Sequence, residues 1–347
     1  MDRLFFLVSG ENPTLPFSEA KSILEAEGFA YQIIEELTQV LRLEADVNCV
    51  QVVKFRSAMT KVCGLEIFSC KADRYEIFEN IEKMNIATLL GENESFAVRV
   101  MRVRGSASNI EAWTLEREIG ELLFEKVKKA KVDLKSPEKT FIGILTDNRF
   151  VFGLKIVEIK HGNFIRRGPR RKAFFHPAAM SAKIARCMIN LAQPKKEDIV
   201  MDPFCGTGSF LVEAGLIGCR IIGFDVKRYM VEGSQRNLRL FNIEPEGLAV
   251  ADARFIPLAN IKIKCVVTDP PYGTSATTLG FTTKDLIGFF FSEARKVLVK
   301  EGRVCVAAPK TIKVSGFGEK SGFEHLESHF IYVHRGLTRE IAVFKLI

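Results

Sequence analysis

The chain has 347 residues, more than one hydrophobic core usually supports, so we expect two or three domains. Hydrophobic residues make up 47% of it, yet charge interrupts the apolar runs well before the roughly 20 residues that a membrane span requires, which argues against a membrane protein. Its 50 basic and 42 acidic residues give a net charge of +8, a balance that favours a polyanionic partner.

The N-terminus and the cysteines indicate the compartment. The apolar start of the chain is followed at once by polar residues 9–12, which does not suit a signal peptide, so we expect a cytosolic protein. The eight cysteines are scattered, without a CxxC pair or a His/Cys spacing that suits zinc, so neither a disulfide framework nor a metal site is expected. Cys63 and Cys70 could lie close together, but ordinary buried thiols are the favoured interpretation.

The first 70 residues have the periodicity of a small α+β unit. Strands are predicted over 4–9, 30–37, 38–43 and 65–68, and helices over 18–27 and 55–63. This βαββαβ order is ferredoxin-like.

A second α+β unit follows, with helices predicted over 72–83 and 109–130 and strands over 96–104, 141–146 and 151–159. Within the strand 96–104, valines alternate with Arg99, Arg102 and Arg104. A solvated strand face explains this pattern, and so does a face that lies on a phosphate backbone, since arginine binds phosphate in a bidentate fashion.

The segment between His161 and Lys172 is strongly basic. It gathers Arg166, Arg167, Arg170 and Arg171 around a Gly-Pro pair. Such a composition does not suit a core, so we expect a linker that joins two halves of the chain and faces a nucleic acid.

The C-terminal half alternates strands with helices, the pattern of a parallel sheet covered on both faces. Strands are predicted over 199–201, 220–224, 247–250, 265–268 and 303–307. Two extended runs, 324–334 and 339–346, flank a turn at Gly336 and predict an antiparallel hairpin that closes the sheet.

A glycine-rich turn follows the first of these strands. It runs from Asp202 through Phe204, Gly206, Thr207 and Gly208 into an apolar helix, and its glycines let the backbone approach a ligand. An acidic residue also ends each of the next two strands, Asp225 about 20 residues further on and Asp252, with Ala253 beside it. In nucleotide-binding sheets, acidic side chains at such positions bind ribose hydroxyls or a base amine.

The fourth strand runs into Asp269-Pro270-Pro271-Tyr272. The consecutive prolines make this loop stiff, and it lies at the ligand-binding end of the sheet. The exocyclic amine of a base is a poor nucleophile because its lone pair is delocalised. The Asp269 carboxylate and the Pro270 carbonyl can hold this amine and stabilise its developing charge, and Tyr272 can stack on the base. The loop 273–284 that follows could be a substrate lid or an ordinary surface loop.

The Asp-Pro-Pro-Tyr motif resembles that of Rossmann-like amino-methyltransferases. The wider chain looks like the THUMP-containing tRNA guanine-N2 methyltransferases, especially the archaeal enzymes that modify guanosine 10. Two further segments carry this resemblance, 132–137, which is similar to the end of a THUMP domain, and 171–177, which resembles the entry into the methyltransferase domain. The resemblance covers nearly the whole chain.

The resemblance implies an α/β fold, a Rossmann-like S-adenosylmethionine-dependent methyltransferase domain with a mixed seven-stranded sheet, preceded by a ferredoxin-like domain and a THUMP domain. The corresponding ranges are 1–70, 71–160, a basic linker over 161–173, and 174–347. S-adenosylmethionine would be bound by the glycine loop, by the three aspartates, by Ala253 and Asp269, and near His176, to which we assign no catalytic role.

The expected reaction is direct methyl transfer to the N2 amine of a tRNA guanosine, without a metal. Arg99, Arg102 and Arg104, with the arginines of the basic linker, are the candidates for contacts with tRNA. A cytoplasmic monomer is expected, with a small activating subunit as an alternative. The rival functions are a DNA or RNA adenine or cytosine amino-methyltransferase, a non-catalytic RNA-binding protein, and, more distantly, a dehydrogenase, since the loop lacks the final glycine of the dinucleotide fingerprint.

Overall fold

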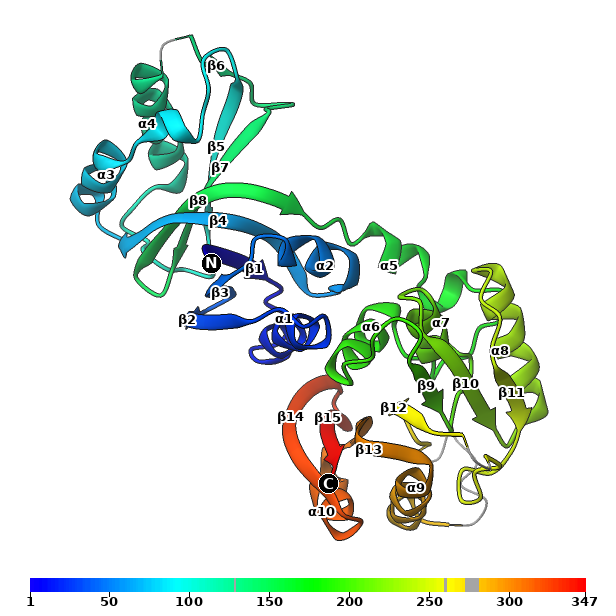
Figure 1. The fold of residues 1–347 in the computed structure, drawn as a ribbon. Helices are drawn as coiled ribbons and strands as arrows, with labels where there is room; N and C mark the ends of the chain where they lie inside the picture. Colours follow the sequence, from blue (N-terminus) through cyan, green and yellow to red (C-terminus); the bar gives the residue numbers. More distant parts are fainter. Residues whose placement is uncertain (128, 259–260, 272–280) are drawn as a thin grey trace. The chain divides into compact units, whose positions relative to one another are not determined.

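The computed structural model describes residues 1–127, 129–258, 261–271 and 281–347 (Figure 1). The chain divides into two compact units. The first unit comprises Met1–Phe17, Phe29–Phe55 and Thr60–Ile159, and the second comprises Ser18–Gly28, Arg56–Met59 and Lys160–Ile347. None of the helices in the described part of the chain combines the length and the apolar character that a membrane span requires.

The N-terminal part has the predicted ferredoxin-like topology. Its elements are β1 (Asp2–Val8), α1 (Leu15–Ala26), β2 (Tyr31–Leu37), β3 (Val40–Ala45), α2 (Cys49–Arg56) and β4 (Thr60–Lys71). The strands lie in the order β2-β3-β1-β4 with antiparallel neighbours. The prediction of a helix over 55–63 was wrong, because α2 ends at Arg56 and residues 60–63 belong to β4. Val62 and Cys63 pair with β1, and this pairing overrides an apolar spacing that also fits a helix.

Further strands extend the same sheet. The elements are α3 (Arg74–Lys83), the 3-10 turn η1 (Ile86–Thr88), β5 (Ser95–Arg102), α4 (Ala112–Lys126), β6 (Lys131–Val132), β7 (Lys139–Thr146) and β8 (Arg149–Glu158). β8 pairs antiparallel with β4, which gives one eight-stranded sheet of order β2-β3-β1-β4-β8-β7-β5-β6. Buried phenylalanines fill its core beneath α3 and α4, with the rings of Phe141 and Phe152 stacked at 6.0 Å.

The second unit contains the alternating strands and helices that the C-terminal half predicted. Its elements after residue 160 are α5 (Gly162–Arg166), η2 (Pro169–Arg171), α6 (Ala182–Leu191), β9 (Ile199–Asp202), α7 (Ser209–Gly215), β10 (Arg220–Asp225), α8 (Arg228–Leu240), β11 (Gly247–Val250), β12 (Ile263–Thr268), α9 (Thr283–Val297), β13 (Leu298–Pro309), η3 (Lys310–Ile312), α10 (Ser315–Lys320), β14 (Phe323–His334) and β15 (Leu337–Leu346). Helix α6 begins at Ala182, where the Ser181 hydroxyl accepts a hydrogen bond from the Ile184 N–H and caps the helix.

The strand order is β11-β10-β9-β12-β13-β15-β14, a seven-stranded mixed sheet. The strands from β11 to β13 are parallel, and the predicted hairpin β14–β15 adds antiparallel to β13. This confirms the predicted fold class. All eight cysteines are buried free thiols, which confirms the favoured interpretation of Cys63 and Cys70.

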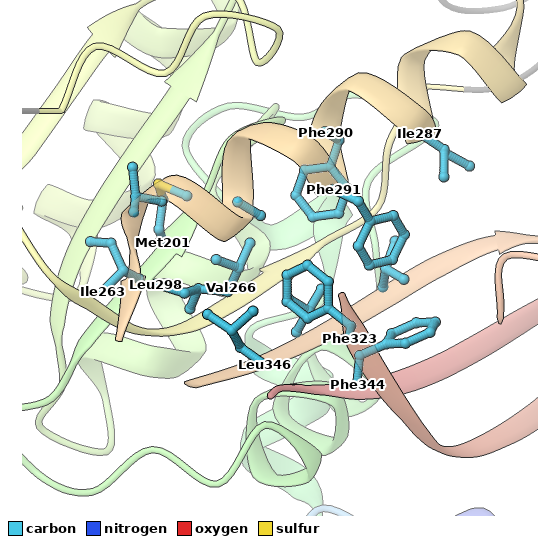
Figure 2. Close-up of a cluster of buried hydrophobic side chains, with 14 of the residues drawn as sticks. Met201, Ile263, Val266, Ile287, Phe290, Phe291, Leu298, Phe323, Phe344 and Leu346 are labelled. Carbon is cyan, nitrogen blue, oxygen red and sulfur yellow. The ribbon is translucent and has the colours of Figure 1, made fainter. Parts of the chain in front are cut away.

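A cluster of aromatic rings joins α9 to the hairpin (Figure 2). The Phe291 ring of α9 lies 5.4 Å from the ring of Phe323 on β14 and 5.0 Å from that of Phe344 on β15. Helix α9 begins with a capping box between Thr282 and Asp285, which satisfies backbone N–H groups of its first turn. The cluster therefore keeps the antiparallel strands attached to the parallel part of the sheet.

Replacing Phe291 by alanine is expected to destabilise the second unit by about 3–5 kcal/mol, because the change leaves a cavity between α9 and the hairpin. Phe289→Ala on the same helix is the matched control, since Phe289 is 45% exposed and should cost about 1 kcal/mol or less. Urea denaturation of both full-length variants measures the difference. Equal midpoints for the two variants would contradict the role of this cluster.

Candidate active site

The carboxyl ends of the parallel strands open onto one cavity of about 980 Å³ within the second unit. Most of the residues predicted for the site line it: His176, Asp202, Phe204, Gly206, Thr207, Asp225, Asp252, Asp269, Pro270 and Pro271. Gly208 and Ala253 lie outside this lining. Tyr272 and most of the predicted lid lie outside the described residues, and the last two residues of that loop begin α9.

The glycine loop between β9 and α7 has the backbone that only glycine adopts without strain. Gly206 and Gly208 have φ angles of +48° and +74°. A Cβ at position 208 would also lie 2.3 Å from the Ser234 hydroxyl oxygen of α8. The second glycine is therefore required for the close packing of the loop against α8, and the first shapes the wall of the cavity.

Asp202 is a buried carboxylic acid that lines the cavity, and only one of its two carboxyl oxygens accepts hydrogen bonds from described residues. Its Oδ1 accepts hydrogen bonds from the Thr268 hydroxyl at 2.7 Å and from the Phe204 N–H at 3.1 Å. Among the described residues, Oδ2 has no hydrogen-bond partner. Burial raises the pKa of Asp202 to about 7, and the carboxylates of Asp225 and Asp269 add to the effect. Such an acid is suited to a cationic donor, and the α-ammonium group of S-adenosylmethionine fits this requirement.

Asp225 and Asp252 differ in their surroundings. Asp225 accepts from the N–H groups of Gly206 and Lys227, and burial raises its pKa. Its carboxylate is thereby held at the cavity edge, where ribose hydroxyls could donate to it. Asp252 instead forms an ion pair with Arg254 at 2.6 Å, and this arginine lowers the pKa of Asp252. The sequence did not indicate Arg254.

Asp269 lies directly after β12 and forms an ion pair with Arg339, whose Nη2 is 3.3 Å from Asp269 Oδ2. Arg339 lies on β15 opposite Pro309 of β13, and both residues line the cavity. No motif in the sequence marks Arg339. It reaches Asp269 only because the hairpin adds antiparallel to β13, which aligns residues about 70 positions apart.

A buried asparagine attaches the segment around Phe174 to the glycine loop. The Asn237 side chain of α8 accepts from the Phe174 N–H and donates to the carbonyl oxygens of Phe174 and Thr207. The Phe174 ring lies against Gly233, where a Cβ would meet it at 2.1 Å. His176 follows on the cavity wall, and its Nδ1 accepts from the Ala178 N–H. The sequence did not indicate Asn237, because an asparagine in a helix has no distinctive spacing.

The arginines considered for RNA binding fall into two groups. Arg99 donates to Glu116 and to the Leu134 carbonyl, and Arg102 donates to the carbonyls of Ser106, Ala107 and Ile110. Arg167 forms a bidentate pair with the buried Glu213. These contacts give the three guanidinium groups a bracing role. Four arginines have exposed side chains: Arg104, Arg166, Arg170 and Arg171.

The affinity for S-adenosylmethionine is expected to rise with pH up to about pH 7, where the Asp202 carboxyl group becomes ionised. Below its pKa of about 7, Asp202 is protonated and must lose this proton before it accepts from the ammonium group. Each pH unit below 7 should therefore weaken binding by up to about tenfold. Calorimetry at pH 6, 7 and 8 measures the effect.

Asp202→Asn should remove this pH dependence, because the amide does not titrate. Because the folded-state pKa is raised, the stability contribution of Asp202 is present below about pH 4 and is lost as the pH rises through about 7. The variant should therefore gain stability relative to the wild type over that range. A pH profile of binding shared by both proteins would show that Asp202 is not the titrating group.

Arg339→Met is expected to lower the rate of the reaction by about tenfold or more, because the Asp269 carboxylate loses the cation that orients it. Cofactor affinity should change little. Arg335→Met, at the exposed turn of the same hairpin, is the matched control. Single-turnover rates and calorimetry separate the two effects, and a loss confined to cofactor affinity would contradict the assigned role.

Comparisons with known families identify two segments. A family described as "RMKL-like, methyltransferase domain" matches residues 169–341, and the THUMP domain matches residues 71–154. The tRNA (guanine(10)-N2)-dimethyltransferase of Methanothermobacter thermautotrophicus is 34% identical over 99% of both chains, and that of Methanocaldococcus jannaschii is 31% identical over 99% of both.

Solved structures agree on the fold. TrmN from Thermus thermophilus superposes with a TM-score of 0.56 at 16% identity, and the match covers 99% of this chain and 100% of that one. A second structure, SMU.472, was determined in complex with SAH, and it matches with a TM-score of 0.56 at 14% identity over 100% of this chain and 99% of that one. At these identities the likeness concerns the fold alone.

Proposed function

Because the chain belongs to the family of tRNA (guanine(10)-N2)-dimethyltransferases, we propose that it transfers methyl groups from S-adenosylmethionine to the exocyclic N2 amine of guanosine 10 in tRNA. The products are N2-methylguanosine and N2,N2-dimethylguanosine. One observation carries the chemical part of this proposal. Asp269 and Pro270, at the end of β12, line the same cavity as the glycine loop and the carboxyl group of Asp202.

Two acceptor groups that follow β12, one on a side chain and one on the backbone, act on the target amine. S-adenosylmethionine supplies, when bound, an activated methyl group on its sulfonium. The Asp269 carboxylate and the Pro270 carbonyl oxygen are acceptors for the amine N–H groups, so together they hold the nitrogen and favour the positive charge that develops on it. Arg339 keeps the carboxylate in place from β15. The target base must leave its stack to reach this cavity, which costs a few kcal/mol that contacts with the RNA offset.

The remaining walls of the cavity suit the cofactor. The residues proposed to bind it are His176, Asp202, Phe204, Gly206, Thr207, Asp225, Asp252 and Asp269, with Asp202 for the ammonium group and Asp225 for the ribose. Gly208 and Ala253 were also predicted from the sequence, but they lie outside the lining of the cavity. For the RNA we propose the exposed arginines Arg104, Arg166, Arg170 and Arg171, since their side chains are accessible to phosphates.

The wider assignment of the chain follows from its relatives. We place a ferredoxin-like domain at 1–70, the THUMP domain at 71–160, a basic linker at 161–173 and the methyltransferase domain at 174–347. The two matched family ranges support the second and the fourth of these. A monomer that acts on tRNA in the cytoplasm is the simplest assembly for such an enzyme.

Asp269→Asn is expected to lower methyl transfer to tRNA by at least about a hundredfold, because the amide offers one acceptor in place of two and places a donor against the amine. Cofactor affinity should fall much less than the rate, because the other residues proposed to bind the cofactor are unchanged. Mass spectrometry of nucleosides from tRNA before and after incubation reports the base, the atom and the number of methyl groups together. Calorimetry measures binding of the cofactor.

Asp198→Asn is the matched control, since Asp198 precedes β9 at the opposite end of the sheet and accepts from the Lys195 N–H. Duplex DNA incubated in parallel tests the rival substrate. Near-normal transfer by the Asp269 variant would overturn the role of this carboxylate, and wild-type methylation of DNA but not of tRNA would overturn the substrate.

A further inference from the structure

The segment from α5 to Pro177 is anchored to the methyltransferase unit at three separate points. Arg167 donates to both oxygens of the buried Glu213, at 2.7 and 3.1 Å. Lys172 donates to the Ser209 hydroxyl at 2.9 Å, and Asn237 holds the backbone of Phe174. These contacts fix the path of the segment. Several side chains between and directly beside the anchors, among them Arg170, Arg171 and Phe175, are therefore presented outward in fixed positions.

These outward side chains form a second pocket, of about 450 Å³. It is lined by Ile165, Gly168, Arg170, Arg171, Phe175 and Pro177. The Phe175 ring is 45% exposed, although its neighbour Phe174 packs against α8. Within the described part of the chain, neither Arg170 nor Arg171 forms an ion pair. The pocket thus combines a partly exposed aromatic ring with two arginines that lack an acidic partner there.

This combination matches the chemistry of an unpaired nucleotide. A base can stack on an aromatic ring whatever its sequence, and arginine binds the adjoining phosphate. The pocket also adjoins the active-site cavity, because Pro177 lines both. When a target base is extruded from the RNA, a neighbouring base loses a stacking partner and can occupy such a site.

We propose that this pocket binds a nucleotide of the tRNA next to the methylated guanosine, with its base stacked on Phe175 and its phosphate paired with Arg170 and Arg171. The proposal rests on the proposed function, since it requires that tRNA is the substrate. It assigns to the linker a specific contact beside the target. This contact helps to offset the cost of extruding the guanine.

The test is the equilibrium affinity of the full-length protein for a tRNA transcript, measured by fluorescence anisotropy with S-adenosylhomocysteine present. Phe175→Ala is expected to weaken binding by at least about fivefold, the lower range for loss of one base stack. Phe175→Trp, which keeps a ring, should bind as the wild type does. Phe289→Ala is the control, because that side chain has the same 45% exposure and lines neither cavity. Calorimetry should give an unchanged affinity for S-adenosylmethionine in all three variants.

Two further measurements identify what the pocket holds. Arg170→Gln combined with Arg171→Gln should lower the salt dependence of tRNA binding by about one to two phosphate contacts. A transcript with an abasic nucleotide on one side of the target should bind the wild type more weakly. The abasic transcript and the intact transcript should bind the Phe175→Ala variant with equal affinity, because this variant has no ring on which the base can stack.

The outcomes distinguish the two proposals. Wild-type protein that binds no tRNA overturns the proposed function, and the nucleotide pocket with it. Normal tRNA binding by the wild type and by Phe175→Ala alike overturns the pocket alone, as does an equal loss in Phe175→Trp. If sedimentation shows that Phe175→Ala instead abolishes a self-association of the wild type, the pocket takes a second copy of the chain and the nucleotide proposal fails.

Discussion

A buried side-chain hydrogen bond joins the carboxyl ends of β9 and β12, two strands that also pair through their backbones. The Thr268 hydroxyl at the end of β12 donates to Asp202 at the end of β9, and both residues are buried. The glycine loop follows β9 and Asp269 follows β12, so this bond and the pairing of the two strands together fix the position of Asp269 relative to the glycine loop. Methyl transfer depends on such distances, since a misplacement of about 1 Å can cost a hundredfold in rate. The core between α9 and the hairpin keeps the strands in register around it.

The electrostatics of the cavity follow from the same arrangement. Parallel strands bring Asp202, Asp225, Asp252 and Asp269 to one edge, where burial raises the pKa of the first two. Arg254 and Arg339 neutralise the other two from positions outside the motifs. The two acids without an arginine, Asp202 and Asp225, accept from backbone N–H groups of the glycine loop. We propose that the ammonium and sulfonium groups of the cofactor supply the missing positive charge there, while Asp269 is oriented by Arg339 toward the target amine.

The sequence predicted secondary structure most accurately where the local residue pattern favours the same element that the fold contains. The strands from β9 to β12 are short and largely apolar, and each has an aspartate at its carboxyl end or within two residues after it. The boundaries predicted for these strands lie within about two residues of those observed. The predictions failed where pairing between strands far apart in the sequence determines the secondary structure. Residues 60–63 have an apolar spacing that fits a helix, but β1 recruits them as a strand. The pairing of β4 with β8 could not be predicted either, because the sequence of a strand does not indicate which distant strand it pairs with.

The motifs from which the chemistry was predicted, the glycine loop and Asp269-Pro270-Pro271, are each contiguous in the sequence, so they can be recognised without knowledge of the fold. The side chains that contact these motifs from far along the chain become evident only in the folded structure. Arg339 reaches Asp269 through the hairpin, and Asn237 links the Phe174 segment to the glycine loop. The structure also shows that the arginines of the linker differ in burial. Arg167 forms an ion pair with the buried Glu213, whereas Arg170 and Arg171 are exposed. Composition treats these residues alike, whereas their burial depends on contacts with residues far along the chain.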